Sequence, residues 1–125
     1  PGGTFYIAEM HPFNTVFSNE KSDKTLRVKY CYFHSKRPTR WQSDGSYADR
    51  TAVISNKSYE WTHSLGDIVN ALIGVGLRID FLHEFPYGFY DHYQFMTKGK
   101  DGWWRLKGGN ATIPLMFSLK ATKPN

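Results

Sequence analysis

Cysteine is nearly absent from this sequence of 125 residues, and long apolar runs are missing from it. With Cys31 as the single cysteine, an internal disulfide bond is excluded, which favours a reducing compartment. Cys31 lies in the stretch KYCYF, where we expect a small buried or half-buried strand residue. No stretch approaches the ~20 apolar residues that cross a bilayer, and no signal peptide is visible. We therefore expect a cytoplasmic protein with no membrane partner.

Spacings typical of metal ligands are missing as well. Five histidines are present, but none pairs with another three or four residues away on a predicted helix. No cysteine cluster accompanies them. The sequence therefore predicts no metal site.

Aromatic residues, by contrast, are abundant. They make up 17% of the chain, with nine Phe, eight Tyr and four Trp, so part of them must line a surface, a pocket or an interface. Because the net charge is +5, a small basic binding module for single-stranded nucleic acid is one interpretation. Against nucleic acid as a partner, the basic residues are spread along the chain and the aromatic residues fall in apolar-patterned segments.

The first segment predicts a strand and a loop. Thr4–Ala8 is a short apolar run after Pro-Gly-Gly, as is typical of a strand buried on both faces of an α/β sheet. His11-Pro12 ends this strand, since proline donates no ladder hydrogen bond. Residues 14–25 are polar and predict a loop.

The region that follows predicts a β-hairpin excursion. Leu26 to His34 alternates apolar and polar residues, which indicates a half-exposed strand. After the turn-rich residues 35–50, the segments Thr51 to Ile54 and Lys57 to Thr62 predict two short strands or one bulged strand.

One helix is expected, from Ser64 to Leu77. Ser64 is a favourable N-cap, Asp67 approximates a capping box, and Gly76 can adopt the left-handed conformation at the end. The expected buried stripe consists of Leu65, Ile68, Val69, Leu72 and Ile73.

Two strands complete the predicted order, separated by a long aromatic loop over residues 87–110. The first runs from Arg78 to Phe85, with Ile79, Phe81, His83 and Phe85 on one face and His83 as a core residue. The last runs from Ile113 to Thr122 with alternating apolar residues. Because one helix cannot cover both faces of a sheet, we expect part of the fold to be missing from this chain.

The Pro-Gly-Gly turn before Thr4–Ala8, followed later by a helix, a strand, a long loop and a last strand, resembles the C-terminal part of class I S-adenosylmethionine-dependent methyltransferases. The stretches YEWTHSLGDIVNALIGVGLRIDFLHEFPY, DGWWRL and IPLMFSLKATK resemble the end of a bacterial, uncharacterised subgroup of these enzymes. The resemblance implies an α/β fold: the C-terminal half of a Rossmann-like sheet. It would hold strands five, six and seven and one main helix, with the β-hairpin excursion inserted and the antiparallel last strand between the other two.

The same resemblance implies that this chain holds only part of a domain. Residues 1–125 would form a single partial domain. Its parts would be residues 1–13 as a central strand and its end, 14–63 as the β excursion, and 64–125 as the helix, strand, aromatic loop and final strand. No Gly-x-Gly turn follows a predicted strand, so S-adenosylmethionine, the implied cofactor, would bind upstream of residue 1. We expect the parent protein to be a methyltransferase with a small-molecule substrate, and this fragment alone to be inactive.

Several residues are candidates for the site. His11 follows the first strand at the edge where open α/β sheets bind ligands, and is either a catalytic base or a cap of the strand end. Tyr59 and Trp61 either form a lid over the substrate or pack against the helix. His63, just before the helix N-cap, either binds substrate or is a hydrogen-bonded structural residue. Tyr87, Phe89 and Tyr90 either line the substrate pocket or cover the sheet edge.

Self-association is a further expectation. If upstream strands are absent, the apolar strand from Thr4 to Ala8 has an exposed edge, which invites pairing with a second copy. The sequence therefore predicts a homo-oligomer built through this strand.

Overall fold

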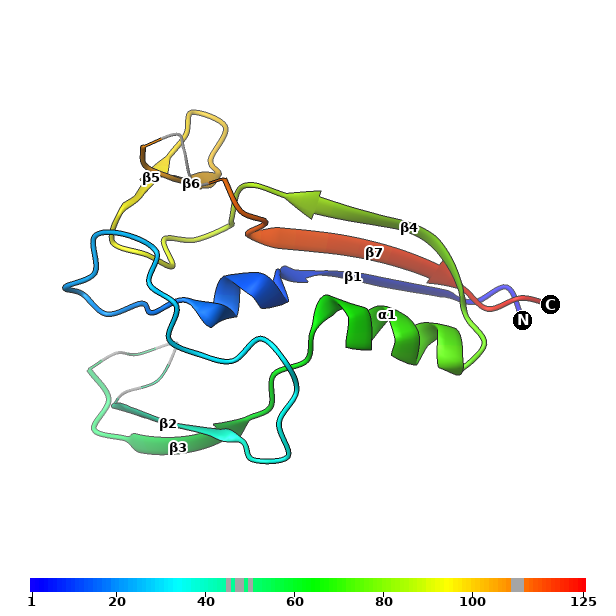
Figure 1. Cartoon of the computed structure of the whole chain (residues 1–125), viewed down its shortest axis with the longest axis horizontal. Helices are drawn as coiled ribbons and strands as arrows, with labels where there is room; N and C mark the ends of the chain where they lie inside the picture. The colour runs from blue at the N-terminus through cyan, green and yellow to red at the C-terminus, as the bar shows by residue number, and fades with distance from the viewer. Residues whose placement is uncertain (45, 47–48, 50, 109–111) are drawn as a thin grey trace.

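The computed structural model describes residues 1–44, 46, 49, 51–108 and 112–125. The described elements, in chain order, are β1 (Thr4–Met10), the 3-10 helix η1 (Pro12–Val16), β2 (Thr39–Asp44), β3 (Ser55–Glu60), α1 (Leu65–Gly74), β4 (Arg78–Phe85), β5 (Met96–Lys98), β6 (Trp104–Leu106) and β7 (Met116–Thr122) (Figure 1). Residues 45, 47, 48 and 50 of the turn-rich stretch, and residues 109–111 at and just after the end of the aromatic loop, lie outside the described part of the chain.

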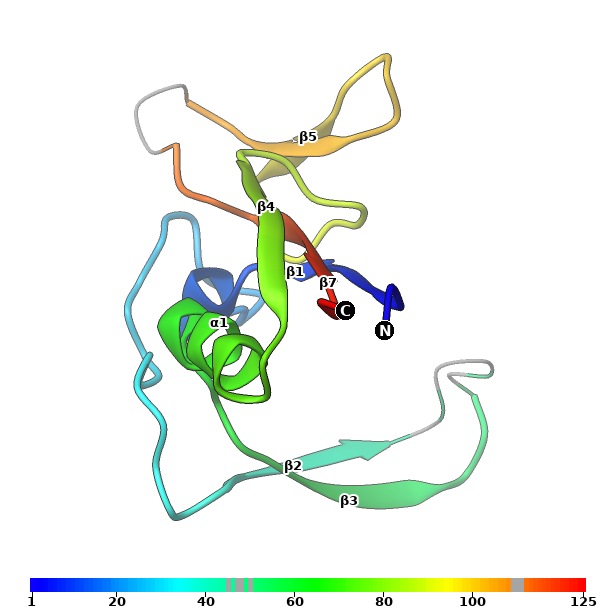
Figure 2. The same ribbon diagram turned by 90° about the vertical axis from the view of Figure 1, so that its right-hand side faces the viewer.

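The strands form three small antiparallel sheets. The largest has the order β1–β7–β4, and the others are the hairpins β2–β3 and β5–β6. Helix α1 and the β2–β3 hairpin lie on one side of the three-stranded sheet, and the β5–β6 hairpin lies beyond the end of the sheet where β4 ends and β7 begins (Figures 1 and 2). The sheet therefore has helical cover on one face only.

The predicted α/β fold class, half of a Rossmann-like sheet, is wrong. Among the described residues, 13% are helical and 35% are in strands, and the strands pair only in antiparallel fashion. The last strand, β7, does lie between β1 and β4, as predicted. Both strands pair with β7 in antiparallel fashion, so the described sheet contains no parallel pair. The aromatic loop, expected to be irregular, instead contributes the β5–β6 hairpin.

Strand β1 is an edge strand rather than a strand buried on both faces. Phe5 is 38% exposed and Tyr6 is 59% exposed, although the apolar run predicted burial for both. Tyr6 lies on the face of the sheet that α1 does not cover, where its ring contacts Phe81. Phe5 shares the covered face with Ile7, but β1 is at the edge of the sheet while α1 packs on the central strand β7, so Phe5 stays partly exposed.

The predicted start of α1 is confirmed, as is the glycine after its end. The Asp67 backbone N–H donates to Ser64 Oγ at 3.0 Å, and the Ser64 N–H donates to Asp67 Oδ2 at 2.9 Å. These reciprocal bonds form a capping box. Gly76, with φ +78°, follows the helix in the left-handed conformation. Four residues of the predicted apolar stripe, Leu65, Ile68, Val69 and Leu72, pack on the β7 cluster of Phe117, Leu119 and Ala121. Ile73, predicted as the fifth member, is 53% exposed, so its prediction as a buried residue is wrong.

Replacing Ser64 by alanine is expected to destabilise the fold by about 1 kcal/mol, because the first turn of α1 loses a hydrogen-bond acceptor. The free energy of unfolding from urea titrations measures this cost. Ser22→Ala, which changes an exposed turn serine, is the control and should leave stability nearly unchanged. A Ser64→Ala variant as stable as the wild type would contradict the capping role.

A β-bulge in β4 corrects the predicted face of this strand. The register with β7 shifts between Ile79 and Phe81. Ile79 therefore packs toward α1, while Phe81 and His83 stack on each other with ring centroids 4.6 Å apart. His83 is exposed, and its prediction as a core residue is wrong because its side of the sheet lacks a covering layer.

The predicted strands before α1 are partly misplaced. Residues 26–34 form no strand and make a single bridge, between Val28 and Phe17. The strand predicted for Lys57 to Thr62 is found as β3, but its partner β2 comes from the turn-rich stretch, not from residues 51–54. Cys31, expected to be at least half-buried, is exposed because its segment is a loop.

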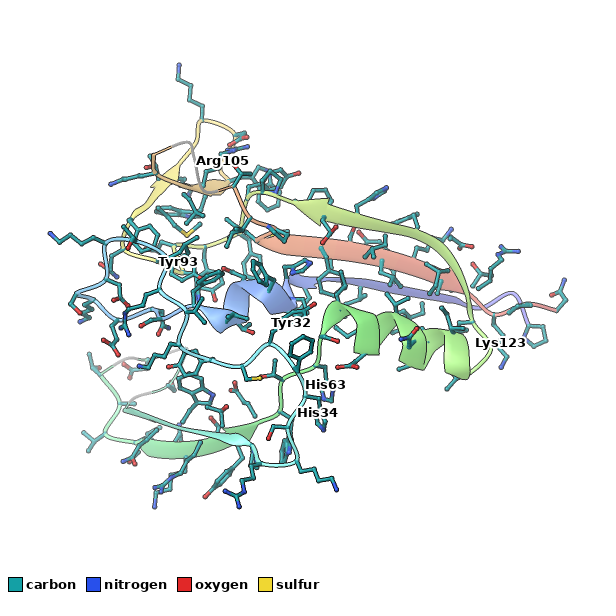
Figure 3. All side chains as sticks on the ribbon, viewed as in Figure 1. Tyr32, His34, His63, Tyr93, Arg105 and Lys123 are labelled. Atoms are coloured by element: carbon teal, nitrogen blue, oxygen red, sulfur yellow. The ribbon has the colours of Figure 1, made fainter. Side chains whose placement is uncertain are left out.

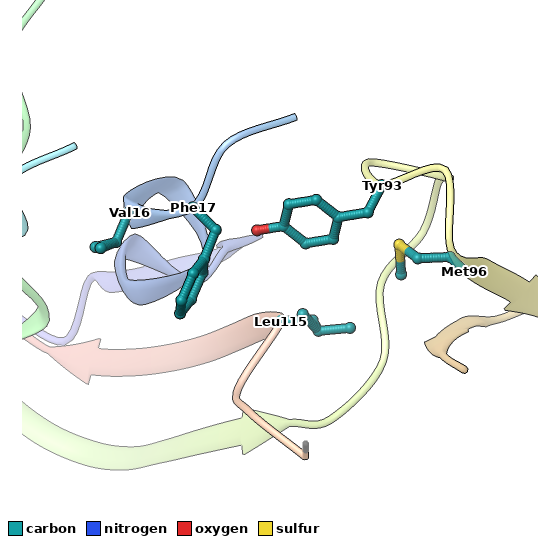
Figure 4. Packing of buried hydrophobic residues seen from close by; sticks show 5 residues of the cluster. All are labelled: Val16, Phe17, Tyr93, Met96 and Leu115. Carbon is teal, nitrogen blue, oxygen red and sulfur yellow. The ribbon is translucent and has the colours of Figure 1, made fainter. Parts of the chain in front are cut away.

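A second core joins η1 to the aromatic loop. Its buried members are Val16, Phe17, Tyr93, Met96 and Leu115 (Figure 4). The Tyr93 hydroxyl reaches η1, with Asn14 O and Asn14 Oδ1 each 2.6 Å away. Burial raises the pKa of this hydroxyl, so it stays protonated as a donor. This core fixes the aromatic loop against the end of β1.

Candidate functional site

A groove lies between the β2–β3 hairpin and the body of the protein. It has a cavity volume of about 280 Å³ and receives side chains from β1, η1, β7, the hairpin and the start of α1. A neighbouring cavity of about 260 Å³ shares five of its lining residues. The shared residues are Met10, Thr15, Tyr30, Trp41 and Glu60. The two cavities therefore form one groove with a common middle section.

Strand alternation explains how the hairpin presents its side chains. Thr39 pairs with Glu60, and Trp41 pairs with Ser58, so these residues share one face of the hairpin. Because Thr39, Trp41 and Glu60 line the groove, that face is turned toward the body. Tyr59 lies on the opposite face and is 55% exposed.

Aromatic rings form the walls of the groove. Tyr30 and Trp41 contact each other in a tilted arrangement, with ring centroids 5.3 Å apart. Trp61, half exposed, is held by a hydrogen bond from its indole N–H to the Lys36 carbonyl oxygen, 3.4 Å away. The indole N–H of Trp41 is buried and has no hydrogen-bond acceptor among the described residues.

The charged groups of the groove are carboxylates. Glu9 and Glu60 line it, and no described lining residue is lysine or arginine, although the chain has 16 of these. Within the described structure, neither carboxylate forms an ion pair. Glu9 accepts a hydrogen bond from the Met10 N–H at 2.9 Å, next to it in the sequence. The groove is therefore negative within a positively charged protein.

Two stacked histidines lie at the α1 end of the groove. His63 lines the groove and stacks on His34, with ring centroids 4.8 Å apart and an interplanar angle of 12° (Figure 3). His34 Nδ1 lies 3.1 Å from the Thr62 carbonyl oxygen. The capping hydrogen bonds of Ser64 lower the pKa of Asp67, and both imidazoles lower it further. A carboxylate that stays ionised therefore stands near the two rings.

A tyrosine–histidine pair lies at the other end. Tyr90 Oη is 2.9 Å from His92 Nδ1 and donates to Met10 Sδ at 3.9 Å. His92 lines the neighbouring cavity. Burial lowers the pKa of His92, so its imidazole is neutral at neutral pH. Burial, and after it the charges of Glu9 and Asp91, raise the pKa of Tyr90.

His11 is buried beside the groove with both ring nitrogens occupied. Nδ1 accepts the Phe13 N–H at 3.0 Å, and Nε2 lies 2.8 Å from Glu84 Oε1. The ring is 3% exposed and packs edge-on against Phe117. His11 was expected to be either a catalytic base or a cap of the strand end. The geometry favours a capping role, since His11 is the N-cap residue of η1, directly after β1, and is not among the residues that line the groove.

The structure separates the six predicted substrate residues. Trp61 and His63 line the groove, and Tyr90 lies at its edge through Met10 and His92. Phe89 contacts Tyr90 with ring centroids 5.0 Å apart but does not line the groove.

Tyr59 and Tyr87 lie elsewhere. Tyr59 is on the outer face of the hairpin, opposite Arg40. Tyr87 packs between Phe85 and Trp103, and the Arg105 guanidinium lies 5.2 Å from its ring centroid. Neither residue is among those that line the groove.

Sequence reasoning missed further groove residues, namely Glu9, Tyr30, Trp41 and Glu60. Trp41 carried a usable signal, because Thr39 and Trp41 alternate with Arg40 and Gln42 as in a half-buried strand. The other three depend on contacts between segments far apart in the sequence. His92 belongs to the aromatic loop that was expected either to line the substrate pocket or to cover the sheet edge.

The described residues do not fit S-adenosylmethionine in the way the resemblance implies. That site needs a glycine-rich turn between a strand and a helix. In the described chain, β1 passes into η1 through His11-Pro12, and α1 is preceded by Thr62 and His63. The Ser64 side chain caps α1.

The described part of the chain provides neither a metal site nor a membrane-spanning helix. No group of three or more His, Cys, Asp or Glu side chains is placed to hold a metal ion. No described helix has the length and apolar character to span a membrane.

Comparisons with known proteins add no relative: no family model, no curated protein and no solved structure matches the chain.

Proposed function

We propose that this chain belongs to an S-adenosylmethionine-dependent methyltransferase of the bacterial cytoplasm, and that its groove binds the small-molecule methyl acceptor. The observation that carries the proposal is the position of Trp61 and His63. Both were predicted to bind substrate, and both line the same groove at the end of β1. A part of the enzyme that this chain does not contain would bind the methyl donor, so this chain alone is expected to be inactive.

The groove residues can perform three tasks in such an enzyme. The rings of Tyr30, Trp41 and Trp61 can orient an acceptor and exclude water from it. The carboxylate of Glu60 can hold a polar or charged group. The neutral imidazole of His92 has a free nitrogen lone pair and can accept a proton.

Single-stranded nucleic acid as the ligand receives less support. A phosphate backbone needs lysine and arginine beside the stacking rings. The described aromatic groove instead carries Glu9 and Glu60, which repel phosphates.

The test is methyl transfer by the protein encoded by the complete gene. With radiolabelled donor and a small-molecule extract, it should label an acceptor, whereas the 125-residue chain alone should not. Trp61→Ala should lower the rate about tenfold, because an aromatic wall of the groove is lost. Tyr87→Ala, an aromatic residue outside the groove, is the matched control and should retain activity. No transfer by the complete protein, or equal losses in both variants, would contradict the proposal.

A further inference from the structure

We infer that the groove binds an organic cation: a small protonated or quaternary amine. Three aromatic side chains, Tyr30, Trp41 and Trp61, line it together with two carboxylates, Glu9 and Glu60. As the identity of the methyl acceptor, this inference rests on the proposed function, and the methyl group would then go to an atom of the ligand that has a lone pair, since an ammonium nitrogen has none. As a binding property, it is measurable without methyl transfer.

Electrostatics gives the sign of the ligand. The faces of aromatic rings attract cations, and tryptophan attracts them most strongly. Glu9 and Glu60 have no basic partner among the described residues, so a bound ammonium group would supply the missing counter-charge. Because no described lining residue is lysine or arginine, no permanent positive charge in the lining competes with such a ligand. An anion would meet two carboxylates and no donor cation.

The chemistry of the walls gives the class of cation. A metal ion would need several oxygen or nitrogen ligands in one place, and the described residues form no such group. Rings and carboxylates together suit a cation with alkyl substituents, whose charge is spread over a larger, weakly hydrated surface. Ile7, Ile68 and Phe117 extend the apolar contact at the floor of the groove.

The size of the groove limits the ligand. A volume of about 280 Å³ lies at the small end of the range for ligand pockets. The neighbouring cavity adds Phe17 and His92 beyond the shared middle section. We therefore expect a compact ammonium head group between the rings, with room for a short arm toward His92.

Choline and its uncharged isostere 3,3-dimethylbutan-1-ol provide a matched pair of probes, because they differ in charge but hardly in shape. NMR titration of the 125-residue chain follows the indole N–H signals, assigned by substitution of each tryptophan. Choline should shift the signals of Trp41 and Trp61 but not those of Trp103 and Trp104. The neutral isostere should bind about tenfold more weakly.

Glu60→Gln tests the charge without changing side-chain shape, and it should weaken choline binding roughly fivefold while leaving the weak binding of the isostere unchanged. Trp61→Leu should weaken choline binding about tenfold. Asp80→Asn is the control, because it removes the same charge from the far end of β4, where Asp80 contacts Arg78 and Thr122. It should bind choline as the wild type does. Glu60 is exposed, so its replacement should preserve the fold even if Trp61→Leu does not.

The outcomes separate this inference from the proposed function. Equal affinity for choline and the isostere, or equal effects of Glu60→Gln and Asp80→Asn, would overturn the cation site. Trp61-dependent methylation of a neutral acceptor would then still support the proposed function. Charge-dependent choline binding together with a complete protein that transfers no methyl group would support the cation site and overturn the methyltransferase.

Discussion

Replacing Phe117 by alanine is expected to lower the free energy of unfolding by about 3–5 kcal/mol. The side chain is 1% exposed and lies near the start of β7, in one cluster with Leu119 and Ala121. Its ring also contacts His11, with centroids 6.0 Å apart, and forms part of the groove floor. Since a domain of this size has a total stability of about 5–15 kcal/mol, the variant should be close to unfolding.

The measurement is urea denaturation followed by circular dichroism, with Phe89→Ala as the matched control. Phe89 loses the same atoms but is 52% exposed, so its replacement should cost less than about 1 kcal/mol. Similar losses for the two variants would show that β7 is not the centre of the core. A Phe117→Ala variant as stable as the wild type would also contradict the predicted stability loss.

Local patterns predicted the elements whose formation depends on neighbouring residues. Helix α1 begins at Leu65, directly after the predicted cap, because Ser64 and Asp67 bond to each other's backbone three residues apart. Strand β4 has the predicted bounds because Pro86 ends it and apolar residues alternate with polar ones along most of its length. In both cases, the decisive contacts lie within a few residues.

The fold class could not be predicted in this way, because it depends on which layers cover the sheet. The apolar run of β1 looks the same whether a second layer covers it or not, and here Tyr6 is exposed. Alternation from Leu26 to His34 likewise resembles a strand, but the segment makes one bridge, and Tyr32 instead accepts a hydrogen bond from the Leu65 N–H at 3.1 Å.

The groove was predictable only where its residues are close together in the sequence. Trp61 and His63 are adjacent to α1 in sequence, so their proximity to its N-terminus follows from the chain itself. Tyr30 and Glu9 reach the groove only through tertiary packing, since they come from a loop and from the end of β1. Periodicity carries no information on that packing.

The chain is expected to form a dimer through the free edge of β1, as the exposed strand predicted from Thr4 to Ala8 suggests. The His11 N–H donates to the Leu115 carbonyl oxygen at 3.0 Å, and the Lys123 N–H donates to the Gly3 carbonyl oxygen at 2.8 Å. Because pairing groups alternate along an antiparallel strand, the odd-numbered residues of β1 face β7. The backbone groups of Tyr6 and Ala8 then face outward, where no described strand pairs with them.

Ala8→Pro should convert this dimer to a monomer, because it removes an outward N–H and leaves the β1–β7 ladder in place. Sedimentation velocity over a range of concentrations measures the change. Ala8→Val is the control, since it keeps the N–H and favours extended backbone, and it should remain dimeric. Two copies paired in antiparallel fashion would place each Tyr6 close to the partner's edge, and an isologous contact of this kind closes at two copies. A wild-type chain that stays monomeric at high concentration would rule out this edge as an interface.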